Sequence, residues 1–209
     1  MPWVEALTQC ERWLPHEETF KFTRVVKVWL RLRGETTVAL DLVDLDETTR
    51  GHMLSELDRD IEEGSLYLGK DLSDAGQQRY PDFLREAIEN GDDNMLEARL
   101  SEPGIFNAMG LRQGKPVKVP SNAPQRLAEG EFNRFYIRGL CLRAIEEGIG
   151  QVVVYRARAS SSPRQESEEL IGSSLDAEAL LNDLRENMGI DTAFGLPPGP
   201  NSGLSARLS

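Results

Sequence analysis

Cysteine and histidine are scarce in this chain of 209 residues. Two cysteines, Cys10 and Cys141, cannot build a disulfide framework, so a reducing compartment is expected. The two histidines, His16 and His52, lie in no recognisable motif, and the sequence has no GxSxG, CxxC, HExxH, Walker or GxGxxG pattern. The sequence therefore favours a protein that is not an enzyme, and we expect neither a cofactor nor a bound metal ion.

Long apolar runs are also absent, and the first residues lack the basic and apolar regions of a signal peptide. These absences predict a cytoplasmic protein without a membrane partner. Acidic residues outnumber basic residues, which gives a net charge of −11. The mean field of such a chain repels phosphate, so nucleic acid is disfavoured as a partner unless a local basic patch overrides it.

Alternating apolar residues predict a long strand over residues 20–33 and a second strand over residues 36–45. With Arg33–Glu35 as the loop, the resulting hairpin places apolar residues opposite each other. The same register sets Lys27 opposite Asp41 and Arg24 opposite Asp44, which is a favourable cross-strand arrangement. We therefore expect an antiparallel hairpin to lead the sheet.

Helical spacing, capping residues and glycine or proline breaks predict most of the remaining elements. Helices are expected from the Asp44–Glu47 capping box to Gly64, from Pro81 to Asn90, over 93–100, over about 124–147, from Ser162 onward and over 175–187; strands are expected over 65–69 and 151–158; residues 103–122 should be irregular, with 116–120 extended. The fold class is α+β, with a hairpin-led antiparallel sheet, several helices and one central buried helix at about 124–147. Residues 1–189 should form one domain, with a possible subdivision near 103–122, and residues 190–209 an extended tail.

The helix that contains EFNRFYIRGLCLRAIEEG, residues 131–148, carries the first candidate site. Apolar residues surround most of it, which is typical of a buried helix. Gly139 would be costly there unless another backbone or a ring packs against it. Arg143 lies on the same face as Tyr136, whereas Arg134 and Arg138 lie on the opposite side. The arginines either pair with internal carboxylates, bind an anion in a cleft, or form an exposed surface with the aromatic residues.

The predicted strand 151–158 adds Arg156, Arg158 and Tyr155 to this set. Basic residues interleaved with aromatic ones can bind nucleic acid or a protein partner, although a half-exposed strand also normally carries charges. A nucleic-acid-binding or processing protein that uses the surface of residues 131–158 is therefore one hypothesis. Its binding should weaken steeply with salt, unlike apolar assembly.

A cluster of acidic residues and one cysteine are expected to have structural rather than chemical roles. Asp41, Asp44, Asp46 and Glu47 could hold a divalent cation, but hairpin pairing and helix capping account for them. Cys141, on the buried helix, is expected to be a small core residue rather than a nucleophile.

The C-terminal segment, residues 190–209, combines apolar side chains with prolines and glycines. Phe194, Leu196, Leu204 and Leu208 are expected to dock in a groove of this chain or of a neighbouring copy, after a turn at residues 201–203. The preferred hypothesis is a non-catalytic interaction or assembly protein, as a structural subunit of a larger complex, with protein partners or self-association and with this segment docking on a neighbour.

Overall fold

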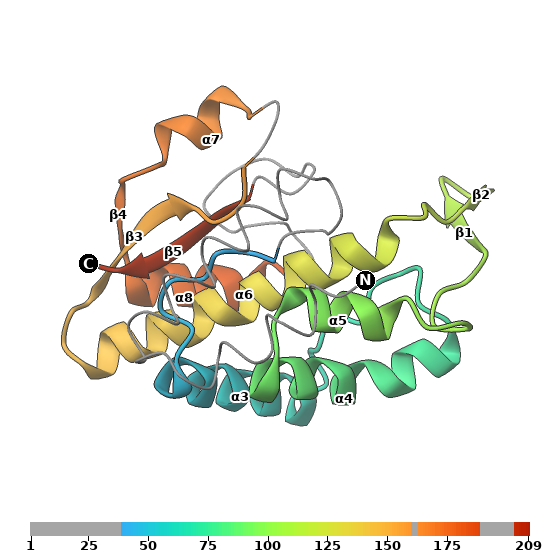
Figure 1. Ribbon diagram of the computed structural model, residues 1–209, viewed down its shortest axis with the longest axis horizontal. Helices are drawn as coiled ribbons and strands as arrows, with labels where there is room; N and C mark the ends of the chain where they lie inside the picture. Colours follow the sequence, from blue (N-terminus) through green and yellow to red (C-terminus); the bar gives the residue numbers. More distant parts are fainter. Residues whose placement is uncertain (1–38, 160–162, 189–202) are drawn as a thin grey trace, which may run out of the picture. The chain divides into compact units, whose positions relative to one another are not determined.

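The computed structural model describes residues 39–159, 163–188 and 203–209, all within one compact unit that extends from Ala39 to Ser209. This unit is an α+β fold with two small antiparallel sheets (Figure 1). Its described elements are α3 (Glu47–Glu62), α4 (Asp74–Asn90), α5 (Asp93–Leu100), β1 (Met109–Arg112), β2 (Lys115–Lys118), α6 (Ala123–Glu146), β3 (Gln151–Arg156), α7 (Gln165–Glu169), β4 (Ser174–Asp176), α8 (Ala177–Glu186) and β5 (Leu204–Leu208).

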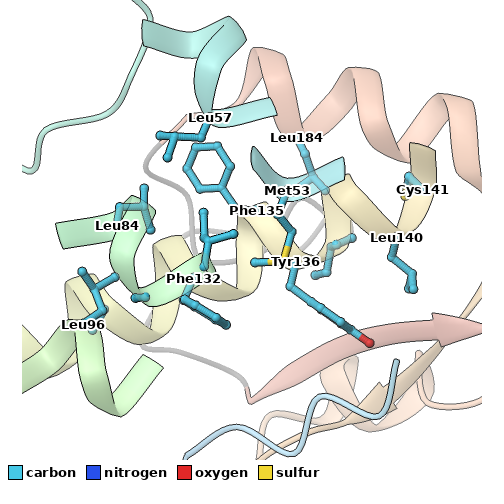
Figure 2. Close-up of a cluster of buried hydrophobic side chains, with 14 of the residues drawn as sticks. Met53, Leu57, Leu84, Leu96, Phe132, Phe135, Tyr136, Leu140, Cys141 and Leu184 are labelled. Carbon is cyan, nitrogen blue, oxygen red and sulfur yellow. The ribbon is translucent and has the colours of Figure 1, made fainter. Parts of the chain in front are cut away.

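Helix α6 forms the centre of the described unit, as its apolar circumference predicts. It contacts α3, α5, α8, β3 and β5, and every residue from 131 to 141 is buried. Figure 2 shows Phe132, Phe135, Tyr136 and Leu140 of α6 within the apolar cluster. The expected central buried helix at 124–147 is therefore confirmed, and its observed start follows Asn122 with proline in the first turn.

Helices α3, α4 and α5 each begin at a side-chain cap. Asp46, Ser73 and Asp92 accept hydrogen bonds from the backbone N–H groups of Thr49, Gly76 and Met95. Two expectations about helix starts are wrong. The cap of α3 is Asp46 rather than Asp44, and Pro81 lies inside α4 instead of beginning it.

Gly139 of α6 marks the closest approach of α6 to α3. A Cβ atom at this position would lie 2.8 Å from Met53 Cγ, 2.9 Å from Met53 N and 3.0 Å from the Thr49 carbonyl oxygen. Two of these three atoms belong to the backbone of α3, which cannot rotate away. Glycine is therefore required because the two helix backbones approach directly at this crossing.

We expect Gly139→Leu to destabilise the protein by ~1–3 kcal/mol through overpacking at this crossing. The helix propensity gained, ~1 kcal/mol, offsets only part of that loss. Urea denaturation of the variant measures the effect. Gly51→Leu on α3 is the matched control, because nothing lies within 4 Å of a Cβ there. A Gly139 variant as stable as the parent would contradict the close crossing.

The second sheet has the strand order β4-β3-β5, with both pairs antiparallel. In the β3–β5 register, Val152 lies opposite Leu208 and Val154 opposite Ala206. Asn133 of α6 holds β5 through two hydrogen bonds. Its Nδ2 donates to the Leu204 carbonyl (2.8 Å), and its Oδ1 accepts from Ser205 Oγ (2.7 Å).

The last residues of the chain are thus part of the sheet rather than of a tail. Leu204 is completely buried and Leu208 partly buried, both against this same chain. The expected docking of these two leucines is an intrachain strand, so they do not serve as an anchor on a neighbour here. Phe194 and Leu196 lie outside the described residues.

Two other segments differ from the sequence-based expectation. Residues 39–45 carry no regular strand, and the remainder of the predicted N-terminal hairpin lies outside the described residues; residues 65–69 also lack a strand. Conversely, the segment 103–122 contains the hairpin β1–β2. A propensity pattern for a strand is realised only where a partner strand supplies the backbone hydrogen bonds.

Candidate functional site: the α6 arginines and an exposed hairpin

Arg138 lies at the centre of a buried ion network between α6 and α3. Its guanidinium donates to Glu56 Oε2 (2.7 Å) and to both carboxylate oxygens of Asp60 (2.7 and 2.8 Å). Arg185 of α8 also donates to Glu56. Arg138 is fully buried, and its guanidinium packs over the ring of Phe135, 4.9 Å from the centroid. The network therefore links three helices through satisfied charges.

Arg134, one turn earlier on α6, is also buried but is held more loosely. Its Nη2 atom lies 3.5 Å from Glu131 Oε2 and 3.8 Å from Asp60 Oδ2, and none of its guanidinium nitrogens makes a hydrogen bond with described residues. Burial raises the pKa of Glu131, although the charge of Arg134 opposes this shift. Arg134 thus acts as a counter-charge in the core rather than as a surface group.

Arg143 is internally paired, which is one of the arrangements expected from the sequence. Its Nη1 donates to Asp46 Oδ2 (2.7 Å) and Thr49 Oγ1 (3.1 Å), and its Nε donates to Glu147 Oε1 (2.7 Å). Burial by itself would raise the pKa of Asp46, but the hydrogen bonds from Thr49 and Arg143 outweigh it and lower that pKa. Arg143 therefore joins the end of α6 to the start of α3.

The two candidate tyrosines anchor the segment 41–44 to α6 and β3. Tyr136 Oη accepts a hydrogen bond from the Asp44 N–H (3.2 Å). Tyr155 Oη accepts from the Val43 N–H (3.3 Å) and donates to the Asp41 carbonyl (2.5 Å). Burial raises the pKa of Tyr155 to about 12, so the hydroxyl stays protonated as the donor that this contact needs.

Arg156, the last residue of β3, and Arg158, which lies beyond the end of this strand, are also paired within the chain. Arg156 Nη2 lies 2.5 Å from Glu168 Oε1 of α7, and Arg158 forms an ion pair with Glu129 of α6. The structure thus places the candidate arginines and tyrosines of residues 131–158 on α6, on β3 and just beyond β3, but each described contact is internal. These contacts do not support a shared anion-binding face.

The exposed hairpin β1–β2, which we call the hairpin arm (residues 109–118), lies within the segment 103–122 that was expected to be irregular. Its register pairs Met109 with Lys118 and Arg112 with Lys115. The two loop residues, Gln113 and Gly114, have φ angles of 50° and 75°. Two successive positive φ angles define the type I′ turn that suits a two-residue hairpin. Gly114 was the sequence signal for this turn, because glycine takes a positive φ without steric cost.

The base of the hairpin arm is fixed, whereas the arm itself is exposed. Asn107 N donates to the Asp71 carbonyl (3.0 Å), and Val119 N donates to the Ala108 carbonyl (3.1 Å). Leu72 and Phe106 form an isolated bridge beside these contacts. Figure 1 shows the arm at the N-terminal end of α6. Every residue of the arm except Gly110 is exposed.

One face of the hairpin arm is apolar. Side chains alternate along a strand, so Met109, Leu111 and Pro116 share a face with Lys118. A Cβ atom on Gly110 would lie 2.6 Å from Asp71 Oδ1, so the opposite face is the one directed at the body. Met109 is 54% exposed and Leu111 is 72% exposed. The apolar face therefore points to solvent.

No group of three or more His, Cys, Asp or Glu residues among 39–159, 163–188 and 203–209 could hold a metal ion. Burial raises the pKa of the Cys141 thiol to about 12, which suits an inert core residue. None of the described helices has the length and apolar character needed to cross a bilayer.

The chain matches no family model, no curated protein and no solved structure. The class of the described unit is therefore defined by its own geometry: an α+β fold around a buried helix, with an exposed apolar hairpin.

Proposed function

We propose that this protein is a non-catalytic assembly protein whose hairpin arm docks on a second copy of the same chain. The observation that carries the proposal is the exposed apolar face of the arm, formed by Met109, Leu111 and Pro116. An ordered surface hairpin with its largest apolar side chains in water is typical of an interaction element. A two-stranded hairpin also gains stability when a partner covers it.

Charge favours contact between copies at this place. Residues 103–128 contain four basic and no acidic residues in a chain with a net charge of −11. Two acidic copies repel each other at long range, and a locally positive contact region lowers that repulsion. The arm therefore offers a place where a second copy can approach at a lower electrostatic cost.

The nucleic-acid hypothesis loses its original support, because Arg134, Arg138 and Arg143 serve internal ion pairs. The hairpin arm keeps three basic residues, Arg112, Lys115 and Lys118, and a two-stranded ribbon can enter the major groove. However, the arm also exposes Met109 and Leu111, which are 54% and 72% exposed, and such apolar side chains suit a protein surface better than a phosphate backbone.

Sedimentation velocity of the full chain at increasing concentration tests the proposal. We expect reversible association that persists at moderate salt, because its main contact is apolar. Leu111→Asp should weaken association by at least about tenfold, since burying an unpaired carboxylate costs several kcal/mol. Ile171→Asp is the matched control, because Ile171 is 40% exposed and lies outside the arm.

Two results would overturn the proposal. One is a parent chain that stays monomeric at every concentration. The other is a monomeric chain that binds a duplex DNA probe at low salt and releases it at moderate salt, which is the behaviour of phosphate binding.

A further inference from the structure

Three side chains in the core of the described unit carry polar atoms that no described residue satisfies. These atoms are the Tyr80 hydroxyl of α4, Glu131 Oε2 of α6 and all three guanidinium nitrogens of Arg134, also of α6. Tyr80, Glu131 and Arg134 are 0%, 4% and 1% exposed. We call these three residues the buried polar cluster. Its donors and its acceptor are directed into the core, where water does not reach them from the surface.

The members of the buried polar cluster lie near one another. Arg134 Nη2 is 3.5 Å from Glu131 Oε2. Burial raises the pKa of the Tyr80 hydroxyl well above its ordinary value; the charge of Glu131 adds to this shift, and the charge of Arg134 opposes it. Charges act on a pKa mainly at short range, so the hydroxyl lies close to both of them.

The neighbouring charged groups are already engaged elsewhere. Asp60 Oδ2 lies 3.8 Å from Arg134 Nη2, but the two oxygens of Asp60 accept hydrogen bonds from Arg138 (2.7 and 2.8 Å). Glu56 is shared between Arg138 and Arg185. The ion network of α3, α6 and α8 is therefore satisfied without Arg134, whose guanidinium keeps its donors unused.

The charges of the buried polar cluster define what would complete it. Buried polar groups without partners destabilise a fold, and groups kept in that state are typical of functional sites. Because Arg134 and Glu131 carry opposite charges, a partner for both must enter as a neutral molecule. It must accept hydrogen bonds from the guanidinium and donate one to Glu131 Oε2. A carboxylic acid meets both needs, since a carboxylate matches the planar guanidinium fork.

We propose that the buried polar cluster binds a small carboxylic acid. The carboxylate of the ligand accepts two parallel hydrogen bonds from Arg134 and one from the Tyr80 hydroxyl. The proton of the acid lies between the ligand and Glu131 Oε2, so that the two carboxyl groups share it. No covalent bond to carbon is made or broken, and the net charge of the core does not change.

The segment 64–69 offers an entry path. It follows α3 without regular secondary structure, and its two end residues, Gly64 and Gly69, have φ angles of 65° and 69°. Tyr67 of this segment is partly exposed, yet its pKa is raised by burial and by the charge of Glu131, against an opposing effect of Arg134. Tyr67 thus links the buried polar cluster to the surface. Hinges of moving segments are often small residues, so the segment can open at its glycines.

Calorimetric titration of the full chain with sodium formate and sodium acetate at mildly acidic pH tests the site. Sodium chloride at the same concentrations is the reference. We expect saturable binding of a single carboxylate per chain, and a melting temperature that rises with acetate but not with chloride. Arg134→Met should abolish both effects, because it removes the guanidinium fork.

Tyr80→Phe separates binding from stability. It removes a buried hydroxyl that no described residue satisfies, so the melting temperature should stay the same or rise. The acetate affinity should fall about tenfold with the loss of one hydrogen bond. Tyr136→Phe is the matched control. Its hydroxyl accepts from the Asp44 N–H (3.2 Å), so this variant should lose stability and keep the parental acetate affinity.

The shared proton gives acetate binding a pH dependence. Burial raises the pKa of Glu131; Arg134 and Arg138 oppose this shift, and Asp60 adds to it. The other titratable groups beside the buried polar cluster are Tyr67 and Tyr80. As the pH rises through the pKa of Glu131, binding must take up a proton, so the acetate affinity should fall by up to about tenfold per pH unit. Glu131→Gln carries a permanent neutral donor, and its acetate affinity should not change over the same range.

Three results would overturn this inference. The first is a parent chain that binds neither probe although Tyr80→Phe is more stable than the parent, which means that internal water alone completes the cluster. The second is acetate binding that survives Arg134→Met. The third is an identical pH profile for the parent and Glu131→Gln, which excludes the shared proton. None of these measurements depends on association between copies, so the assembly function is tested separately.

Discussion

Replacing Arg138 by methionine is expected to destabilise the protein by ~3–5 kcal/mol, the usual cost of removing one partner of a buried ion pair. Methionine restores the apolar volume but leaves the carboxylates of Glu56 and Asp60 without their shared counter-charge. Because domains are commonly stable by only ~5–15 kcal/mol, this single change would remove a large share of the total stability. Urea denaturation at neutral pH measures the loss.

The matched control for this prediction is Arg143→Met. Arg143 also pairs with two carboxylates, Asp46 and Glu147, but both acceptors are about half exposed. Water can solvate those carboxylates after the change, so the loss should be much smaller. Equal losses for the two variants would contradict the distinction between a buried network and a surface network.

The pH dependence of stability should follow Glu56. Burial alone would raise the pKa of Glu56, but the hydrogen bond from Arg185 and the charge of Arg138 outweigh it, so that pKa lies below its ordinary value of 4.5. A lowered folded-state pKa contributes stability that is present above the unfolded-state pKa and is lost as the pH falls through the folded-state pKa. The Arg138→Met variant loses most of this contribution of Glu56 at neutral pH. The difference in unfolding free energy between the parent and the variant should therefore become smaller as the pH falls into the acid range.

Removal of residues 204–209 is expected to cost at least ~3 kcal/mol, because it exposes apolar core and orphans a buried polar group. The deletion uncovers Val152 and Val154, which are almost fully buried in the β3–β5 pair. It also removes both hydrogen-bond partners of the Asn133 side chain. The midpoint of urea denaturation should fall accordingly.

Deletion of Ser209 alone is the control for the truncation. Ser209 is exposed and lies outside β5, so its loss should change stability by less than ~0.5 kcal/mol. If the longer truncation melted at the parental temperature with unchanged assembly, β5 would contribute nothing to the fold. If it lowered association without lowering stability, the original hypothesis of docking on a neighbour would be favoured instead.

The sequence by itself determined the elements whose signals are local. The α6 helix follows from apolar residues around most of its circumference, and a glycine at position 139 inside a helix predicted a closely packed neighbour. β3 follows from Val152, Val154 and their alternation. Helix ends at Glu62 and Asn90 follow from the glycines just beyond them. In each case the information lies within a few residues of the element.

Tertiary structure alone decided the partners of the charged and apolar side chains. Arg138 lies 82 residues from Glu56 along the chain, and no local pattern selects that carboxylate among the 35 acidic residues. Nothing local to Leu204, an apolar residue after a glycine, predicts a strand. It belongs to β5 because β5 pairs with β3 and because the Asn133 amide donates to the Leu204 carbonyl. The physical reason is that helices satisfy their backbone bonds within the segment, whereas strands and buried charges need a partner that the fold must bring to them.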